Sequence, residues 1–522
     1  MTVYNINLGI GWASSGVEYA QAYRANILRN TNENAKFIFM DLILADNIAH
    51  LTQNMGFRHS EIIWLYQFFS DIPIHPTTMT VEEVLSGVVG TPEYSEKLSD
   101  RVVRYFYPET DSFVTCYFVR NSNQLVEHAE FVSRGNLLRK DYYSTKRYLS
   151  EFFVPKNGVA VCYNRTIYNS DGTTAYEILI ENGEEVLFRF KNHVCYGRTE
   201  FIAYFLEQLQ FTTEDIIILD RETDIGPMVF ERAVRDGAKL GVVVHAEHFS
   251  DAIQTDDYLL WNNFYDYQFT NADKVDFFIV STQAQKDVLA TQFTKYTPHN
   301  PKIIVLPVGS IDCLKMSDYR KPFSLMTASR LAGEKHVDWL VRGVALAHEV
   351  IPDLTFDIYG SGGEEGKIRE TIEKYHAGEY IHLMGHCDLT DVYQQYEVYL
   401  TASTSEGFGL TLLEAIGSGL AMIGFDVPYG NQTFINNEEN GYLIPLSKHR
   451  VEDVIAKSFS EEIIRLYHTN ALSYMRNGSY RIAGCIHQKG NFRHTCIKLG
   501  CFQYIGFLFY LKFKDRVKVG VS

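Results

Sequence analysis

The sequence predicts an α/β protein of two Rossmann-like domains facing a cleft, with an antiparallel β-sheet inserted into the first domain. Short apolar runs alternate with helical patterns at both ends of the chain, as in parallel sheets crossed by helices. Between these regions, alternating runs separated by turn signals are typical of β-hairpins. Because ligands bind at the carboxyl ends of parallel strands, the glycine-rich turns that follow such strands are candidate sites.

The first domain is expected to comprise residues 1–53 and 196–306. A strand from Val3 to Leu8, a glycine-rich loop from Gly9 to Gly16, a helix from Val17 to Arg29 and a strand from Ala35 to Phe39 form a βαβ start. The α/β pattern resumes after Thr199. Buried parallel strands are then expected at 216–219, 239–244, 277–280 and 303–306.

Residues 54–195 are expected to form the inserted domain, a meander of antiparallel hairpins. A sheet of this kind presents edges on which a partner or acceptor can dock, and aromatic side chains such as Tyr117, Phe118 and Phe131 would assist. The alternative is a sheet that only adds stability. The alternating runs are at 112–119, 125–132, 140–143, 159–163, 175–180 and 185–190.

A second α/β domain is expected over residues 307–475, after a hinge at Pro307 to Gly309. Its strands should lie near Leu325, Phe356, Ile381, Val398 and Met422.

The tail, residues 476–522, differs from the rest of the chain. It carries nine Lys or Arg and one Asp, whereas the whole chain has a net charge of −16, and it holds three of the eight cysteines. We therefore expect that it is not an integral part of the folded core. Two interpretations stay open: a basic arm that binds a membrane or a partner, or a translated frameshift.

The bulk composition excludes several classes of protein. The chain is 46% apolar and 21% charged, which is ordinary for a globular protein, and its negative net charge argues against nucleic-acid binding. The cysteines show no C-x-x-C motif and indicate free thiols in a reducing compartment. No secretory signal or membrane-length apolar stretch is evident. These features predict a cytoplasmic protein, and the basic tail would permit peripheral association with the inner face of the cell membrane.

Two carboxylates, Glu406 and Glu414, lie eight positions apart around a glycine-rich turn. Glu414 should lie inside a helix and Glu406 in the loop before it, and eight residues of helix would point both acids roughly the same way. Gly407 and Gly409 let backbone N–H groups approach a ligand closely. The arrangement suits a nucleotide-sugar, with one acid near the sugar and the other near the ribose. A plain Glu-Gly turn before an amphipathic helix is the alternative.

Two cations, Arg330 and Lys335, follow the apolar segment from Phe323 to Ala328. Such a pair can clamp a diphosphate, Arg by its fork and Lys as a point charge. The start of a solvated helix is the alternative. A further strand and turn, from Phe356 to Gly362, lies between this pair and the two acids.

The paired acids, the Arg330 and Lys335 pair and the glycine-rich first loop resemble retaining GT-B glycosyltransferases of family four. The opening from Tyr4 to Ala20 and the inserted sheet are more closely similar to the catalytic subunits of accessory-Sec O-GlcNAc transferases, which initiate glycosylation of serine-rich repeat adhesins in Gram-positive bacteria. The resemblance covers residues 1 to about 475.

This resemblance implies a role for each matching residue. Arg330 and Lys335 would stabilise the leaving UDP. Glu406, with the backbone of the next three residues, would hold the GlcNAc hydroxyls, and Glu414 would bind the ribose. His245 would lie near the sugar, although a core histidine is the alternative. The remaining substrate-binding residues would be Gly16, Val17, Glu18 and Tyr19 at the diphosphate or uridine, Gly385 and His386 at the uracil, and Gly407, Phe408 and Gly409 at the sugar.

The chain contains no Asp-x-Asp motif, which fits an enzyme with no metal and no cofactor, in which cationic side chains and a helix dipole replace Mg²⁺. The resemblance implies transfer of GlcNAc from UDP-GlcNAc to Ser or Thr of an adhesin, together with a homologous partner subunit that binds the acceptor. Two alternatives stay open: a family-four transferase for a wall polymer or capsule, and a non-catalytic acceptor-binding partner of the same fold. The two intact charged pairs argue against the non-catalytic partner.

Overall fold

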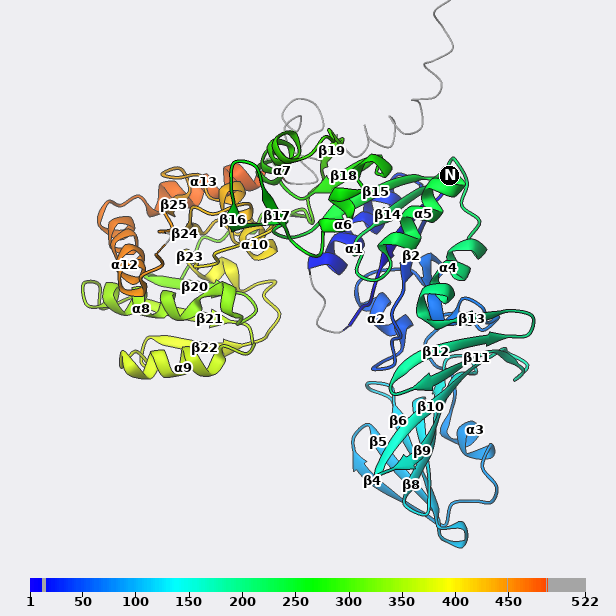
Figure 1. The fold of residues 1–522 in the computed structure, drawn as a ribbon. Coiled ribbons are helices and arrows are strands. Elements are labelled where there is room, and N and C mark those ends of the chain that lie inside the picture. The colour runs from blue at the N-terminus through cyan, green and yellow to red at the C-terminus, as the bar shows by residue number, and fades with distance from the viewer. Residues whose placement is uncertain (12–15, 448, 485, 487–522) are drawn as a thin grey trace, which may run out of the picture. The chain divides into compact units, whose positions relative to one another are not determined.

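The computed structural model describes residues 1–11, 16–447, 449–484 and 486, and the chain divides into two compact units (Figure 1). The first unit is Met1–Val243 with Phe264–Asp276, and the second is Val244–Asn263 with Phe277–Ser522. Among the described residues, no helix has the length and apolar character needed to cross a membrane.

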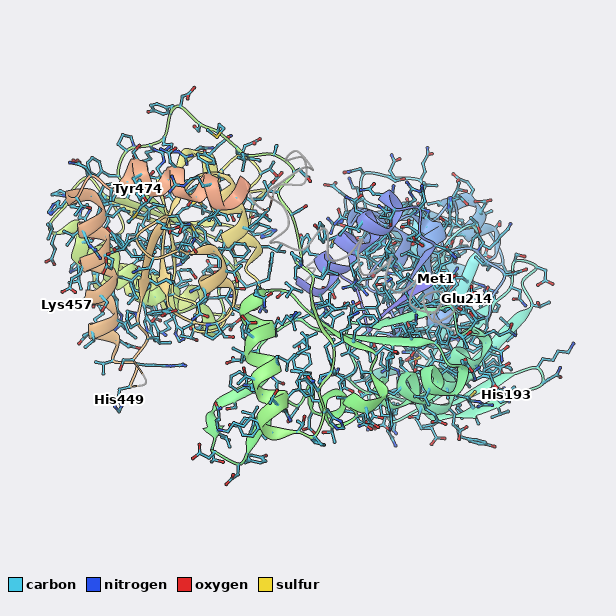
Figure 2. All side chains as sticks on the ribbon, turned by 90° about the horizontal axis from the view of Figure 1, so that it is seen from above. Met1, His193, Glu214, His449, Lys457 and Tyr474 are labelled. Carbon is cyan, nitrogen blue, oxygen red and sulfur yellow. The ribbon has the colours of Figure 1, made fainter. Side chains whose placement is uncertain are left out.

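A parallel sheet of buried apolar strands organises the first unit. Its strands β15, β14, β1, β2 and β3 follow one another in that spatial order, so β1 lies between β14 and β2 where the chain order reverses. The β1 N-terminus lies close to the loop before β14, where the Met1 amine is 3.8 Å from Glu214 Oε2 (Figure 2). The strands are β1 (Val3–Asn7), β2 (Ala35–Phe39), β3 (Ile62–Trp64), β14 (Ile216–Leu219) and β15 (Lys239–Val244).

Helices connect these strands, and the opening βαβ unit is confirmed. Asn47 caps the start of α2, since its Oδ1 accepts from the N–H of Ala49 at 2.8 Å. The helices of the unit are α1 (Gly16–Asn30), α2 (Ile48–Asn54), α4 (Gly197–Gln208), α5 (Gly226–Asp236) and α6 (Asp266–Thr270), with short 3₁₀ turns η1 (His59–Glu61), η2 (Leu65–Gln67) and η4 (Ala272–Lys274).

The predicted start of the insertion at residue 54 is too early. β3 pairs in parallel with β2, with Phe37 opposite Ile62 and Phe39 opposite Trp64, and Trp64 is buried. Residues 62–64 therefore belong to the Rossmann-like sheet. A strand of three residues is too short to show a pattern of its own.

The inserted antiparallel sheet is confirmed and has ten strands, each beside its neighbour in sequence (Figure 1). The helix α3 (Val81–Ser86) packs on it through Val81 and Val84. The strands are β4 (Tyr94–Ser99), β5 (Val102–Tyr107), β6 (Ser112–Phe118), β7 (Val126–Ser133), β8 (Asn136–Tyr143), β9 (Arg147–Lys156), β10 (Val159–Tyr168), β11 (Thr174–Glu181), β12 (Glu184–Phe190) and β13 (Val194–Tyr196), with a 3₁₀ turn η3 (Pro108–Thr110) between β5 and β6.

The aromatic residues proposed for docking on this sheet do not share one environment. Phe118 is buried in the cluster that contains Val84 of α3, so it is not available to a partner. Tyr117 and Phe131 are half-buried, and the guanidinium of Arg139 lies 4.2 Å from the ring centroid of Phe131.

A second parallel sheet organises the second unit, in the order β22-β21-β20-β23-β24-β25. β20 and β23 are neighbours, so the chain order reverses between them, and in such sheets ligands bind outside the carboxyl ends of these strands. The strands are β20 (Ser324–Ala328), β21 (Thr355–Tyr359), β22 (Ile381–Gly385), β23 (Val398–Thr401), β24 (Ala421–Phe425) and β25 (Gly441–Ile444).

Helices flank this sheet, and α8 and α12 bury apolar faces in its core. Lys457 of α12 and Tyr474 of α13 mark two of them in Figure 2. The remaining elements of the second unit, some of which lie outside this sheet and its helices, are α7 (Gln283–Tyr296), which packs on the paired strands β18 (Phe277–Val280) and β19 (Ile303–Val305), α8 (Val337–His348), α9 (Glu365–Lys374), α10 (Leu410–Gly417), α11 (Gly430–Phe434), α12 (Glu452–His468) and α13 (Leu472–Gly484), strands β16 (Phe249–Gln254) and β17 (Leu259–Trp261), and 3₁₀ turns η5 (Gly333–Lys335) and η6 (Tyr393–Gln395).

The boundary expected at 306/307 differs from the division into units. Residues 244–263 and 277–306 count with the second unit, although the sequence places them in the first domain. Hydrogen bonds to the rest of the second unit explain part of this: the Ser281 hydroxyl donates to Gly407 O at 3.2 Å, and the Tyr429 hydroxyl lies 3.0 Å from His248 Nδ1.

The end of the second domain at residue 475 is also too early. α13 continues to Gly484, and Ser479 is buried, with its hydroxyl donating to Leu420 O at 2.6 Å. The Tyr480 hydroxyl donates to Lys315 O at 2.8 Å. Residues 476–484 are therefore an integral part of this unit. The expectation for the rest of the tail falls on 485 and 487–522, which lie outside the described residues.

Candidate active site

An ion pair at the carboxyl ends of β20 and β23 is the centre of the candidate site in the second unit. Lys335 Nζ lies 2.7 Å from Glu406 Oε2, although the two residues are 71 positions apart. Their side chains are 15% and 19% exposed, so both charges are largely enclosed yet still reach solvent. Lys335 ends the turn η5 after β20, and Glu406 lies in the loop after β23. The pair thus bridges the point where the strand order reverses, the expected ligand position in this type of sheet.

Glycines allow the Glu406 loop to lie against its neighbours. A Cβ at Gly407 would come within 2.5 Å of His245 O, which side chains never tolerate, so only glycine permits this approach. Gly409 has φ +84° and ends the loop directly before α10. The Ser281 hydroxyl donates to Gly407 O at 3.2 Å. The structure therefore brings His245, Glu406 and Gly407 together, as the predicted site requires.

A second glycine turn packs against the segment that carries Arg330. A Cβ at Gly360 would meet Ser329 O at 1.9 Å, and one at Gly362 would meet Leu331 O at 2.3 Å. The Leu331 N–H donates to Ser361 O at 3.0 Å. Backbone hydrogen bonds hold the loop ends of β20 and β21 in fixed register, which preorganises the edge of the sheet for a ligand.

Arg330 does not share the surroundings of Lys335. Its side chain is 80% exposed, and its guanidinium lies 3.2 Å from Glu334 Oε1. The Glu334 carbonyl accepts from the N–H of Thr404 at 3.1 Å, which ties this turn to the loop after β23. That Arg330 and Lys335 bind the same diphosphate stays a prediction.

Glu414 has partners other than those of Glu406. It lies within α10, where neighbouring groups exclude water from its carboxyl and raise its pKa, although the residue as a whole is exposed; Tyr393 and Lys315 lower this pKa. The expected common direction of the two acids was based on continuous helical spacing. Helical spacing does not apply between Glu406 and Glu414, because α10 begins only at Leu410 and Gly409 turns the chain before it.

The segment predicted to contact uracil follows β22. Gly385 has φ +72°, and its carbonyl accepts from the N–H of Gly360 at 2.8 Å, so it lies beside the second glycine turn. His386 is exposed. Phe408, whose backbone is expected at the sugar, buries its ring against Phe434 at a centroid distance of 5.1 Å.

The remaining predicted residues lie at the start of α1 in the first unit. Gly16 and Tyr19 are exposed, whereas Val17 and Glu18 are buried. Glu18 Oε1 accepts from Asn7 Nδ2 at 3.2 Å, and Asn7 also donates to Gln21 at 3.2 Å. Through this network Glu18 positions α1 against the end of β1. Of the four predicted residues, the exposed Gly16 and Tyr19 would then be the ones that contact a ligand directly.

Several residues around the candidate site were not predicted. Ser329 Oγ is buried and, among the described residues, has no hydrogen-bond partner, as expected where a ligand would complete the site. Ser281 and Tyr429 support the Glu406 loop. Ser329 could have been found from its position at the end of a strand, directly before the predicted Arg330, whereas Ser281 and Tyr429 give no sequence signal because their partners are far along the chain.

One group of described residues has the composition of a metal site. The ligand atoms of Asp46, His50 and Glu127 in the first unit lie within 4.8 Å of one another. They already satisfy one another: His50 Nδ1 is 3.0 Å from Glu127 Oε1 and 3.8 Å from Asp46 Oδ1, and both contacts raise the pKa of His50 to about 9. A protonated histidine between two carboxylates accounts for this group.

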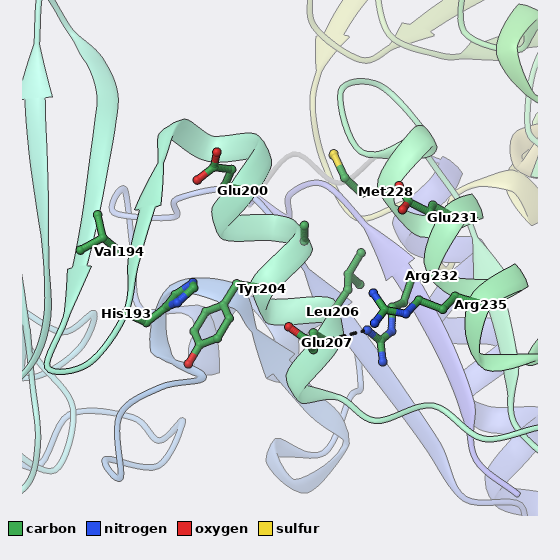
Figure 3. A pocket seen from close by; sticks show the side chains of 11 residues that line it. His193, Val194, Glu200, Tyr204, Leu206, Glu207, Met228, Glu231, Arg232 and Arg235 are labelled. Atoms are coloured by element: carbon green, nitrogen blue, oxygen red, sulfur yellow. Dashed lines mark ion pairs between the residues drawn. The ribbon is translucent and has the colours of Figure 1, made fainter.

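A hollow of about 300 Å³ on the first unit contains none of the predicted site residues (Figure 3). His193 and Tyr204 stack on one side, with ring centroids 4.1 Å apart, and Arg232 lies 3.9 Å from Glu207. It therefore lies apart from the candidate site around Lys335 and Glu406 in the second unit.

Two family models match the chain. The GtfA extended beta-sheet domain matches residues 95–192, within the ten-stranded sheet, and the group 1 glycosyl transferases match residues 322–469, which contain Arg330, Lys335, Glu406 and Glu414.

Relatives match over nearly the whole length. The GtfA subunits of UDP-N-acetylglucosamine–peptide N-acetylglucosaminyltransferase from Streptococcus gordonii and from Streptococcus pneumoniae are each 59% identical over 484 residues; these cover 92% of this chain and 95% or 96% of the relative.

Solved structures agree. A crystal structure of the pneumococcal O-GlcNAc transferase GtfA in complex with UDP and GlcNAc has a TM-score of 0.90 and 55% identity, covering 100% of this chain and 99% of that chain. A GtfA/B complex has a TM-score of 0.89 and 56% identity, covering 98% and 99%. TarM, at 17% identity and a TM-score of 0.68, shares the fold.

Proposed function

We propose that this chain, which belongs to the family of GtfA subunits of UDP-N-acetylglucosamine–peptide N-acetylglucosaminyltransferases, transfers GlcNAc from UDP-GlcNAc to Ser or Thr hydroxyls of a serine-rich repeat adhesin. The observation that carries the proposal is the Lys335–Glu406 pair, 2.7 Å apart at the strand reversal of the second sheet. A relative 55% identical to this chain is solved with UDP and GlcNAc.

Lys335 acts on the donor's diphosphate as the sugar–phosphate bond breaks. Negative charge grows on the leaving UDP, and an enclosed ammonium stabilises that charge more strongly than one in bulk water. Arg330, exposed and beside Glu334, can turn its fork towards the same phosphates. Binding of the diphosphate would compete with Glu406 for Lys335, so donor binding frees the Glu406 carboxylate to accept hydrogen bonds from the sugar.

Glu406 and the backbone of Gly407, Phe408 and Gly409 hold the GlcNAc hydroxyls, with His245 beside them. Close approach of His245 O to Gly407 supports this assignment. Glu414 binds the ribose, Gly385 and His386 the uracil, and Gly16 and Tyr19 the donor from the first unit. Retention of anomeric configuration would follow from attack on the face that UDP leaves, because no carboxylate nucleophile for a double displacement is evident among the described residues.

The reaction is proposed to need no metal and no cofactor, because cationic side chains neutralise the diphosphate. The acceptor is delivered by a homologous partner subunit, for which the solved GtfA/B complex of a relative is the support. We place the enzyme in the cytoplasm, where UDP-sugars are made, with peripheral association at the inner face of the cell membrane.

The test is incubation of the purified chain, with and without its partner subunit, with a serine-rich peptide and a panel of UDP-sugars. We expect UDP release with UDP-GlcNAc and a peptide mass increase of one HexNAc, and no release with UDP-glucose. Transfer to a poly(glycerol-phosphate) or poly(ribitol-phosphate) acceptor but not to peptide would favour a wall-polymer enzyme. No UDP release from any donor would favour a non-catalytic binding subunit.

A further inference from the structure

A fully buried histidine, His248, lies in the second unit and takes no part in the site described above. It follows β15, and its side chain is 0% exposed. His248 Nε2 is 2.7 Å from Gln292 Oε1 of α7, and His248 Nδ1 is 3.0 Å from the Tyr429 hydroxyl. The His248 ring is also nearly parallel to that of Tyr429, with centroids 5.8 Å apart. A buried side chain whose two ring nitrogens are both hydrogen-bonded is held rigidly, and it restricts the movement of its hydrogen-bond partners.

The two hydrogen bonds define the state of the imidazole. Burial lowers the pKa of His248 to about 4, so the ring is neutral at physiological pH and has one donor and one acceptor. The amide oxygen of Gln292 can only accept, so Nε2 carries the proton. Nδ1 is then the acceptor, and the Tyr429 hydroxyl donates to it. The direction of the chain is therefore Tyr429 to His248 to Gln292.

Tyr429 is joined directly to the Glu406 loop. The backbone N–H groups of Tyr429 and Gly430 both donate to Glu406 O, each at 2.8 Å. A Cβ at Gly430 would meet Phe408 O at 2.3 Å and Glu406 Cγ at 2.9 Å, so the segment at 429–430 lies against the Glu406 side chain itself. A shift of Tyr429 would therefore move the main chain and the Cγ of Glu406.

We propose that His248 is a positioning residue for glycosyl transfer: through Tyr429 it fixes the main chain of Glu406, and so holds the Glu406 carboxylate opposite Lys335. The inference rests on the proposed role of Glu406. Gln292 anchors the far end of the chain on α7, the same helix whose Gln285 donates to Ala246 O next to His245. One helix thus sets the position of both the His245 segment and the Glu406 loop.

The test uses Tyr429→Phe and His248→Phe, which remove hydrogen bonds and keep an aromatic ring. Each is expected to lower kcat for UDP release by about tenfold to a hundredfold, the effect of a small misplacement of a reacting group, while the Kd for UDP changes less than about threefold. The double variant should be no worse than the more impaired single variant. Tyr142→Phe is the matched control, since it removes a buried phenol hydrogen bond to Glu151 in the inserted sheet, and it should leave kcat unchanged.

Two further measurements separate this inference from the proposed function. In a Glu406→Gln background, Tyr429→Phe should cause no additional loss of kcat; an additive loss would overturn positioning through Glu406. Hydrogen exchange does not depend on activity: His248→Phe should speed exchange of the Gly430 amide at least tenfold and leave the amides of α8 unchanged. Unchanged exchange at Gly430 overturns the proposal even if the chain is a transferase. Faster exchange without any UDP release from the wild-type chain would support the His248 link and remove the proposed function.

Discussion

At the scale of single residues, the chemistry depends on two enclosed charges that neutralise each other until a substrate arrives. In the described part of the chain, Lys335 and Glu406 form an ion pair only with each other, so removing one leaves the other largely enclosed and unpaired. By contrast, Arg330 and Glu334 form an exposed pair of the kind that contributes about 0–1 kcal/mol. The two pairs are therefore expected to respond very differently to substitution.

We expect Glu406→Gln to lower turnover by a factor on the order of 10² and to leave the fold intact, because a preorganised carboxylate beside the sugar is lost. Lys335→Ala should weaken UDP binding and slow transfer. The double variant should fall short of the product of the two effects, with a coupling of about 1–3 kcal/mol, since the groups are in direct contact. Calorimetry with UDP and steady-state kinetics measure both terms.

Glu334→Gln is the control for this cycle, and its kcat should stay within about twofold of wild type because the Arg330–Glu334 pair is exposed. Near-normal turnover of a folded Glu406→Gln protein would remove Glu406 from the site. Additive effects of Lys335→Ala and Glu406→Gln would mean that their ion pair has no bearing on catalysis.

His50 links α2 to β7 of the inserted sheet, and its charge makes that link dependent on pH. Asp46 and Glu127 raise the pKa of His50 from 6.5 to about 9, while Arg101 also contacts Glu127 at 3.2 Å. Because the pKa of His50 is higher in the folded chain than in the unfolded chain, its protonated form stabilises the fold. This contribution is complete below pH 6.5, where the histidine of the unfolded chain is also protonated. It is lost as the pH rises through about 9. The Tm advantage of wild type over His50→Gln should be largest near pH 6 and vanish by about pH 10. An advantage that is constant with pH would show that His50 is uncharged.

At the scale of elements, continuous apolar runs could be predicted as strands, whereas β3, β4, β9 and β25 were missed. The run at 216–219 is apolar throughout and buried on both faces, and its bounds were predicted correctly. β4 is exposed at every position and β3 has three residues, so neither leaves an apolar pattern. In the candidate site, local motifs such as Glu406-Gly407 could be found, whereas Tyr429 and His248 act through contacts between distant segments, which periodicity cannot reveal.

α13 shows why a helix can be missed. Its buried positions include Gly478 and Ser479, small residues that let the helix lie against residues 439–440, so the apolar periodicity is weak. A Cβ at Gly478 would meet Glu439 O at 2.1 Å. Close packing at Gly478 and Ser479 therefore adds to the burial of Met475 and Ala483 in docking this helix.

We expect Gly478→Ala to lower the Tm, because the helix must shift away from Glu439 and lose packing worth about 1–3 kcal/mol. Gly366→Ala in α9 is the matched control: nothing lies within 4 Å of its Cβ position, so the higher helix propensity of Ala should raise stability by up to about 1 kcal/mol. Calorimetric scans of both variants give the comparison. A stabilised Gly478→Ala protein would show that α13 is not closely docked.

At the scale of the whole molecule, metal independence is a property that purified protein can test directly. EDTA should leave UDP release unchanged, because Arg330 and Lys335 supply the positive charge that Mg²⁺ would otherwise provide. Full loss of activity with chelator, restored by Mn²⁺ or Mg²⁺, would contradict this. A change in Tm with EDTA and no change in turnover would instead point to the Asp46, His50 and Glu127 group.

The inserted sheet is built into the first unit more firmly than a simple appendage. Phe188 of β12 stacks on Phe201 of α4 with centroids 4.0 Å apart, and the Tyr66 hydroxyl donates to Glu185 at 2.6 Å. Deleting the whole insertion would expose apolar side chains of α4 to solvent. Loss of activity in such a deletion variant could then result from misfolding and would not test docking. Point changes at the far edge of the sheet are the cleaner test of docking.

That edge is β4, where every residue is exposed and Tyr94 and Leu98 are large apolar side chains. An unpaired edge strand with apolar side chains is a template for pairing with another chain. We expect Tyr94→Lys with Leu98→Lys to weaken association with the partner subunit at least tenfold and to abolish peptide glycosylation, while the Kd for UDP stays within about twofold. Val234→Lys, at an exposed position of α5, is the control and should change neither property. Undiminished association of the β4 variant, measured by sedimentation, would place the partner on another surface, and weakened UDP binding would show that this sheet supports the active site directly.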